Sequence, residues 1–231
     1  MNNAVFRFEV PRNEEVLSYA PGSNEHIEIK AELDRQSSQE VEIPAVIGGR
    51  EVRTGRLGKV VMPHDHGHVL ANYHKSGQQE VAMAIEAALK ARTEWSKLSW
   101  VDRASVMLKA AELISKKYRH LVNAATMLGQ SKNAYQAEID AACESADFLR
   151  FGAYAASYIY EWQPSSGGDC VNRVEYRPLE GFVFAVSPFN FTSTALNLVA
   201  SVALMGNAVV WKPATTSLLS NYYLMKVFKE A

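Results

Sequence analysis

The chain has 231 residues, of which 48% are hydrophobic and 21% are charged, and its formal net charge is −1. This composition is typical of a globular protein, and the absence of long charged blocks disfavours nucleic acid and anionic membrane surfaces as partners. No apolar run reaches the roughly 20 residues that cross a bilayer, and the first residues lack the layout of a secretory signal.

The N-terminal part predicts an extended arm followed by a hairpin. Residues 1–40 are polar and irregular, with a short helix expected near residues 29–36. In IPAVIGGREVRTG, β-branched residues flank Gly48 and Gly49. Two adjacent glycines readily supply the positive φ angles of a tight turn, so this stretch predicts a β-hairpin. We expect the next stretch, MPHDHGHVLANYHKSG, to form a loop and a short strand.

Helical periodicity extends from residue 78 to residue 158. The first helix starts at Gln78, and the second follows Ser99, which has the form of a capping box with Asp102. A third helix is expected to stop before Gly129, and a fourth covers about residues 133–158. The expected inward positions are Val81, Ile85, Ala88, Leu89 and Trp95 in the first helix, Ala104, Met107, Leu108, Ala111 and Ile114 in the second, and Ile139, Ala142, Cys143, Ala146, Leu149 and Ala153 in the fourth.

The last part of the chain predicts a parallel sheet. WQPSSGGDCV is rich in turn residues, and VNRVEYRPLEG alternates as a strand does. A strand at 182–186, a helix at 193–205, a strand at 208–211 and a helix at 217–229 follow. Both strands are apolar throughout, as parallel strands covered on both faces are. Because a βαβα unit leaves both sheet edges open, we expect the fold to be incomplete within this chain.

Polar residues follow both of these strands. Residues 187–190 follow the first strand, and Lys212 follows the second. In open α/β sheets ligands bind outside the carboxyl ends of the strands, so both segments should lie at one edge. The Asn190 amide could donate to a developing oxyanion, and Lys212 could hold a sugar hydroxyl or a phosphate. On residue types alone, a helix-capping Asn190 and a solvated Lys212 are the favoured interpretation.

The histidines of HDHGH (His64, His66 and His68) and SSGGD raise two further possibilities. Alternate histidine spacing without a distant cluster of cysteines or carboxylates is weak evidence for a metal, so we expect a polar surface loop. The SSGGD stretch lacks the glycine spacings of the common phosphate-binding loops, which predicts a flexible turn.

The local sequence alone predicts no catalytic role for the two cysteines or for two glutamates of the long helix. Cys143 lies on an apolar helix face and is expected to be a small buried residue. Cys170 lies in a turn without a nearby histidine, which disfavours a nucleophile. The two do not form a disulfide framework, which suits a reducing compartment. Glu138 and Glu144 are six residues apart, so they lie on different faces, and we expect both to be solvated.

The motifs of the last part resemble the aldehyde dehydrogenase superfamily. PFNF followed by GN-x-VVWKP is a specific two-part signature of its nucleotide-binding domain. NEEVLSYAPGSNE, IPAVIGGREVRTG and GQSKNAYQAEIDAACESADFLRF are similar to one branch, the Δ1-pyrroline-5-carboxylate dehydrogenases. These enzymes use NAD to oxidise glutamate semialdehyde to glutamate in proline degradation. The resemblance runs from about residue 6 to the end of the chain.

The resemblance implies an α/β fold class and a partial aldehyde dehydrogenase fold, with the first βαβα of a Rossmann-like parallel sheet. It divides the chain into an N-terminal arm and hairpin (1–60), the helical part of the cofactor-binding domain (61–162), a hairpin of the oligomerisation type (163–180) and an incomplete NAD-binding sheet (181–231). For the full-length chain it implies a homo-oligomer. We expect a cytoplasmic protein, with the mitochondrial matrix as the alternative.

The resemblance also implies roles for single residues. In the family a cysteine thiolate attacks the aldehyde, and an asparagine amide and a backbone N–H hold the resulting oxyanion. The implied roles are oxyanion donor for Asn190, adenosine ribose binding for Lys212, the cofactor groove for Ser187 and Phe189, and substrate contact for Phe191 and Glu144. Many members carry glutamate where this chain has Thr215, which leaves the choice between NAD and NADP open.

The family's nucleophile and general base correspond to positions beyond residue 231, and neither Cys143 nor Cys170 matches the nucleophile. We therefore expect this chain by itself to be catalytically inactive. One alternative is a non-catalytic truncated chain that acts as an assembly or interaction piece by docking its arm and hairpin onto full-length subunits. Another is a simple nucleotide-binding module.

Overall fold

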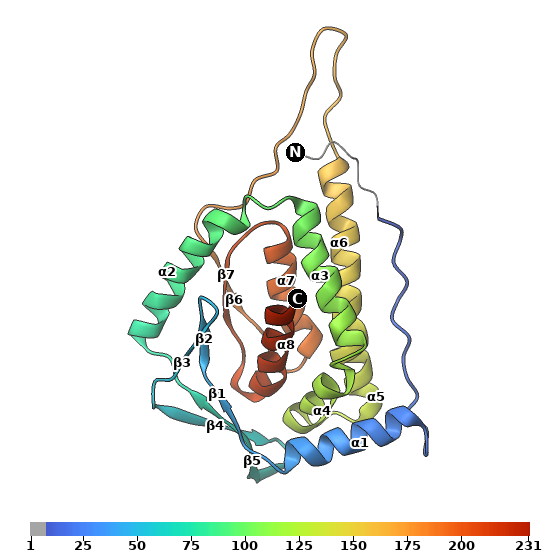
Figure 1. Ribbon diagram of the computed structural model, residues 1–231, viewed down its shortest axis with the longest axis vertical. Helices are drawn as coiled ribbons and strands as arrows, with labels where there is room; N and C mark the ends of the chain where they lie inside the picture. The colour runs from blue at the N-terminus through green and yellow to red at the C-terminus, as the bar shows by residue number, and fades with distance from the viewer. Residues whose placement is uncertain (1–7) are drawn as a thin grey trace.

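The computed structural model describes residues 8–231, and an extended segment at its start lies along the outside of the helical body (Figure 1). The segment leads into helix α1 (Asn24–Ser37), which contains the predicted short helix but starts five residues earlier. Its start is set by Ser23, whose Oγ accepts a hydrogen bond of 3.3 Å from the His26 N–H. This N-cap satisfies one of the backbone donors that a helix start leaves free.

Two small sheets follow the first helix. Strands β2 (Ala45–Ile47) and β3 (Arg50–Val52) form the predicted hairpin, and Gly48 and Gly49 have φ angles of 55° and 76° at its turn. Strands β1 (Val41–Ile43), β4 (Leu57–Met62) and β5 (Asp65–His74) form a sheet in the order β1-β5-β4. The prediction of a loop and one short strand after the hairpin was wrong. As the central strand, β5 is paired on both sides and buries Leu70 and Ala71, so pairing outweighs its polar start.

The helical part confirms most of the predicted elements. It contains α2 (Gln78–Trp95), α3 (Trp100–Ser115), α4 (Arg119–Gln130), α5 (Ala134–Ala137), a π-helix (Glu138–Glu144) and α6 (Ser145–Glu161). Ser99 caps α3 as predicted, because its Oγ accepts from the Asp102 N–H at 3.1 Å. Helix α4 passes through Gly129 and ends after Gln130, where Ser131 adopts a left-handed φ of 53°. The predicted stop before Gly129 was therefore wrong.

Helix α2 does not bury the face that its periodicity predicts. Within α2 only Ala88 is buried, whereas Val81 has 51% and Leu89 has 46% of its surface exposed. The helix lies at the side of the body, where it contacts β2 and β7 (Figure 1). The predicted face of α3 is buried except for the partly buried Leu108, because α3 packs along α6.

Residues 162–182 protrude from the body as a long excursion of the chain (Figure 1). The strand predicted for VNRVEYRPLEG is absent, because no strand lies between Glu161 and Val183. A side-chain amide replaces the backbone ladder here. The amide of Gln163 accepts from the Val174 N–H at 2.8 Å and donates to the Val174 carbonyl at 3.3 Å.

The predicted βαβα unit is confirmed. It consists of β6 (Val183–Val186), α7 (Thr192–Leu204), β7 (Val209–Lys212), a 3₁₀ turn (Thr215–Ser217) and α8 (Leu218–Glu230), and β6 and β7 are parallel. Only Ala185 of β6 is buried, and Phe184 has 60% of its surface exposed, so the expected covering of both faces is not found.

The core lies where α7 and α8 pack against α3, α4 and α6, and the chain is a mixed α/β structure. Its largest fully buried side chains include Ile114, Leu149, Leu196, Leu219 and Leu224. None of the helices described between residues 8 and 231 combines the length and the apolar character that crossing a bilayer requires.

Candidate functional site

The two predicted site segments meet at the carboxyl ends of β6 and β7. Val186 is in register with Lys212, and the Ser187 N–H donates to the Lys212 carbonyl at 3.3 Å. The Ser187 side chain is buried and accepts a hydrogen bond of 3.0 Å from Nε1 of Trp211. The strand pairing therefore brings residues 187–190 and Lys212 to one edge, where the sequence placed them.

Asn190 and Lys212 carry exposed functional groups at this edge. Both residues are exposed, and within residues 8–231 neither the Asn190 amide nor the Lys212 ammonium has a hydrogen bond or an ion pair. Phe189 beside them is also exposed. The interpretation of Asn190 as a helix cap was wrong, since the N-cap residue of α7 is Phe191 and no side chain of the preceding loop caps the helix.

The first turn of α7 is capped from another part of the chain. Oδ2 of Asp140 accepts from the Thr192 N–H at 3.0 Å, and Oδ1 accepts from the Ser193 N–H at 2.9 Å. Lys132 pairs with the same carboxylate, with Nζ 2.6 Å from Oδ2. Sequence reasoning missed Asp140 and Lys132, because a single acidic residue inside a helical stretch has no pattern that distinguishes a buried cap from a solvated side chain.

The two predicted substrate residues lie beside the start of α7, where Phe191 is the N-cap residue and Glu144, at the end of the π-helix, contacts Ser193. Glu144 is half-buried and accepts a hydrogen bond of 2.8 Å from the Ser193 hydroxyl, so the expectation that it is solvated was only partly met. It lines an open pocket of about 380 Å³ together with Asn13, Asp147, Phe148 and Phe151. Phe191 is exposed and does not line this pocket; Lys132 Nζ lies 4.1 Å from its ring centroid.

The histidines of HDHGH make separate local contacts. His64 Nδ1 lies 2.7 Å from Ser131 Oγ, and His68 Nε2 lies 2.9 Å from the Ser37 carbonyl. The stretch is exposed at His64, Asp65, His66 and Gly67, so the predicted surface position is confirmed, but His66 and His68 belong to β5, so the predicted loop was wrong. In the part of the chain that the structure describes, no three His, Cys, Asp or Glu side chains form a group that could hold a metal ion.

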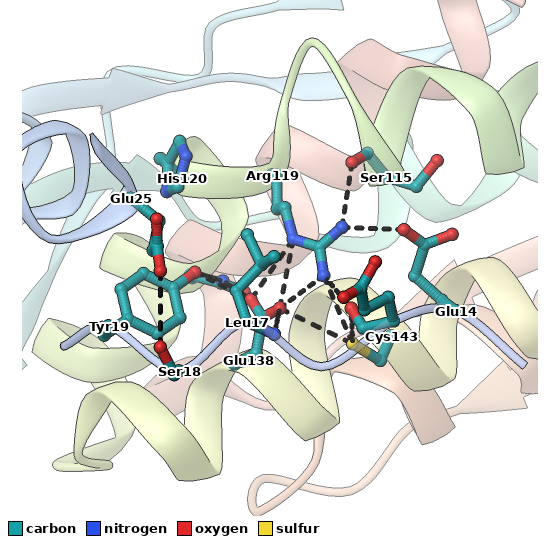
Figure 2. A network of polar contacts seen from close by, with 12 residues as sticks. Glu14, Leu17, Ser18, Tyr19, Glu25, Ser115, Arg119, His120, Glu138 and Cys143 are labelled. Atoms are coloured by element: carbon teal, nitrogen blue, oxygen red, sulfur yellow. Dashed lines mark hydrogen bonds and ion pairs between the residues drawn. The ribbon is translucent and has the colours of Figure 1, made fainter. Parts of the chain in front are cut away.

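Glu138 was predicted to be solvated, but its side chain is fully buried (Figure 2). It accepts hydrogen bonds from the Leu17 N–H (2.9 Å), the Tyr19 hydroxyl (2.7 Å) and the Asn123 amide (2.7 Å), and it forms an ion pair with Arg119. Burial opposes ionisation of this carboxyl, but Arg119, the Leu17 N–H and the Tyr19 hydroxyl outweigh it and hold the pKa of Glu138 below its usual value. The prediction that Glu138 is solvated was wrong.

Arg119 connects the same cluster to the N-terminal segment (Figure 2). Its Nη1 lies 2.7 Å from Oε1 of Glu14, and its Nη2 donates to the Glu15 carbonyl. Tyr19 adopts a left-handed φ of 54°, which is costly for a residue other than glycine. The phenol bond to Glu138 helps to hold that conformation, so the cluster fixes residues 14–19 on the helices.

Cys143 lies beside this cluster rather than at the sheet edge. Its Sγ is 3.6 Å from Oε1 of Glu138, and burial together with that carboxylate raises the pKa of the thiol to about 12. The predicted burial is confirmed. At neutral pH the group is a thiol rather than the thiolate that acts as a nucleophile.

We expect a thiol reagent such as Ellman's reagent to modify one cysteine of the native chain rapidly and the other only after unfolding. Cys170 is exposed, whereas Cys143 is buried and protonated. Titration with and without denaturant should give one and two reactive thiols, and Cys170→Ser should remove the fast one. Fast labelling of native Cys170→Ser would contradict the buried position of Cys143.

The comparison with family models identifies the chain. The model of the aldehyde dehydrogenase family matches residues 52–231. The chain belongs to the aldehyde dehydrogenase family. Its family segment therefore contains the helical body, the protruding segment and the whole β6–α8 unit.

Within the family, the chain is similar to Δ1-pyrroline-5-carboxylate dehydrogenases. The enzyme of Agaricus bisporus is 50% identical over 230 residues, which are 99% of this chain and 42% of that protein. The human mitochondrial enzyme is 43% identical over 219 residues, or 95% of this chain and 39% of that protein. The crystal structure of the Mycobacterium tuberculosis enzyme bound with NAD superposes with a TM-score of 0.97 at 45% identity, covering 99% of this chain and 43% of that one. This chain thus spans about two fifths of the length of these relatives, and it matches their N-terminal portion.

Proposed function

We propose that this chain is the N-terminal portion of an NAD-dependent dehydrogenase that oxidises L-glutamate 5-semialdehyde to glutamate in proline degradation, and that it is inactive by itself. The observation that carries the proposal is the free amide of Asn190. It lies at the carboxyl edge of a parallel strand pair, and Asp140 rather than Asn190 caps the helix that follows.

In this proposal Asn190 supplies one of the donors that stabilise the oxyanion. When a thiolate attacks the aldehyde carbon, the carbonyl electrons move onto the oxygen, and Nδ2–H of Asn190 donates to the charge that develops there. The amide needs no reorganisation, because it has no partner to leave within residues 8–231. The thiolate would come from a part of the enzyme outside these 231 residues, which is why we propose that the chain alone does not turn over.

The edge of the sheet fits the adenosine side of NAD. The Lys212 ammonium is exposed and without a partner in the described chain, so it can donate to ribose hydroxyls, and Phe189 beside it is also exposed. Thr215 supplies a hydroxyl where many family members have a carboxylate. NAD, when bound, would accept the hydride from the aldehyde carbon.

For the substrate, we propose that Glu144 recognises the amino group of glutamate semialdehyde. The carboxylate is held by the Ser193 hydroxyl and lines the open pocket between Asn13 of the N-terminal segment and the first residues of α6. Phe191 would flank the aldehyde from the adjacent loop, where Lys132 stacks on its ring.

For the assembly, we propose that the protruding residues 162–182 contact a second subunit. The apolar side chains of Trp162, Val171 and Leu179 are exposed there, and the segment has no strand pairing of its own. A cytoplasmic location stays a prediction, and the names of the Dictyostelium discoideum and human relatives place those proteins in mitochondria.

The test is a chimera in which residues 1–231 replace the matching N-terminal portion of the Mycobacterium tuberculosis enzyme. We expect the chimera to form NADH from glutamate semialdehyde, and the 231-residue chain alone to form none. A folded chimera that fails to oxidise this aldehyde, or NADH formation by the chain alone, would overturn the proposal. Stable co-purification of the chain with an intact enzyme would instead favour the role of an assembly piece.

A further inference from the structure

We propose that Asp140 is a positioning residue that holds Asn190 in place for catalysis through the first turn of α7. The inference rests on the proposed role of Asn190 as an oxyanion donor. Asp140 itself does not reach the reacting atoms in this proposal. It acts by fixing the backbone on which Asn190 stands.

The backbone donors at the start of α7 require an acceptor that their own loop does not supply. A helix leaves its first N–H groups without intrahelical partners, and a Ser, Thr, Asp or Asn at the N-cap usually accepts from one of them. Here the N-cap residue is Phe191, whose side chain has no acceptor. The carboxylate of Asp140 takes the place of an N-cap side chain. One of its oxygens accepts from the Thr192 N–H and the other accepts from the Ser193 N–H.

The negative charge of Asp140 is stabilised at this position by positive charge on two sides. Its surface is only 1% exposed, so its ionised form requires compensation. Lys132 supplies a cation at 2.6 Å, and the positive end of the α7 dipole supplies partial charge. Hydrogen bonds to a charged acceptor are stronger than bonds between neutral groups, so the carboxylate holds Thr192 and Ser193 more firmly than an ordinary N-cap would.

The loop between β6 and α7 is fixed at both ends, with Asn190 between them. At its start, Trp211 donates to Ser187, and the Ser217 hydroxyl donates to the Pro188 carbonyl at 3.4 Å. At its end, Asp140 holds the first turn of α7, and Lys132, the partner of Asp140, contacts the ring of Phe191.

Asp140 therefore separates two tasks that an asparagine before a helix would otherwise combine. If the Asn190 amide capped α7, it could not point at a substrate. With the cap supplied by the π-helix, the amide is free within residues 8–231 while its backbone stays fixed. Irregular helical turns of this kind occur frequently at functional sites.

The experiment compares Asp140→Ala and Asp140→Asn in the ¹⁵N-labelled 231-residue chain. We expect hydrogen exchange at the Thr192 and Ser193 amides to be about tenfold faster in Asp140→Ala, because a charged acceptor is lost. The side-chain NH₂ signals of Asn190 should shift and their heteronuclear NOE should fall. Asp140→Asn keeps the shape of the side chain and one acceptor oxygen, so its changes in amide exchange and in the Asn190 signals should be intermediate. If Asp140→Ala does not fold, the same measurements on Asp140→Asn test the proposal.

Ser99→Ala is the matched control, since it removes the cap of α3 at a distance from the loop. It should lower stability without moving the Asn190 signals. Unchanged Asn190 signals in folded Asp140→Ala or Asp140→Asn would overturn the positioning role. In the chimera, Asp140→Asn should lower kcat and leave KM for the aldehyde unchanged. If Asn190→Ala left kcat of the chimera unchanged, the proposed oxyanion role of Asn190 would be wrong. The NMR signals of Asn190 in the Asp140 variants would still show whether Asp140 holds the loop.

Discussion

Replacing Arg119 by methionine should lower the free energy of unfolding by about 3–5 kcal/mol, because removal of one partner leaves the other charge buried and uncompensated. Arg119 is almost fully buried and bridges Glu138 in the π-helix to Glu14 in the N-terminal segment (Figure 2). Urea denaturation followed by circular dichroism measures the loss. Limited proteolysis should also cut the segment before α1 sooner, because the segment loses the contacts of Glu14 and Glu15 with Arg119.

Arg53→Met is the matched control for this experiment. Arg53 forms ion pairs with Glu42 and Glu51, but all three side chains are about half exposed, and solvent screens such pairs. The urea midpoint should therefore stay close to that of the unchanged chain. Adding Glu138→Gln to Arg119→Met should recover part of the loss, since no ionised carboxylate then remains buried without its cation. Equal midpoints for Arg119→Met and Arg53→Met would show that the buried cluster does not stabilise the chain.

Replacing Asn190 by alanine should lower kcat of the chimera about 10²–10³-fold, the usual effect of losing one oxyanion donor. The KM for the aldehyde should change little, because the bond strengthens as charge develops on the oxygen rather than in the bound aldehyde. The melting temperature should also be unchanged, since the amide makes no hydrogen bond within residues 8–231. Steady-state NADH formation and a thermal melt separate these effects.

Asn197→Ala provides the comparison for Asn190→Ala. Asn197 lies on α7, a turn beyond the loop, and its side chain makes no hydrogen bond in the described part of the chain. It should leave kcat of the chimera unchanged. An Asn190→Ala chimera with the kcat of its parent would rule out Asn190 as the oxyanion donor, whatever the position of its amide.

The predictions that succeeded concerned elements with a strong local signal. Gly48 and Gly49 specify a turn by their own conformational freedom, and Ser99 can start a helix with its own hydroxyl. The apolar runs around Ala185 and Val210 correctly predicted two strands, because β-branched and aromatic residues favour extended backbone even where, as here, the runs are only partly buried. The predictions that failed concerned segments whose environment lies elsewhere in the chain. β5 is a strand because it has a neighbour on both sides, whereas residues 171–181 pair with no strand of the described chain.

The family, the βαβα unit and the placement of residues 187–190 and Lys212 at one sheet edge could all be predicted from the sequence, because they follow from motifs and from the geometry of parallel strands. The roles of the acidic residues of the π-helix became clear only in the folded chain. Glu138 and Asp140 look alike in the sequence, yet one holds the N-terminal segment and the other caps α7. The effect of a buried carboxylate depends on which donors surround it. Here those donors come from residues up to 121 positions away in the sequence.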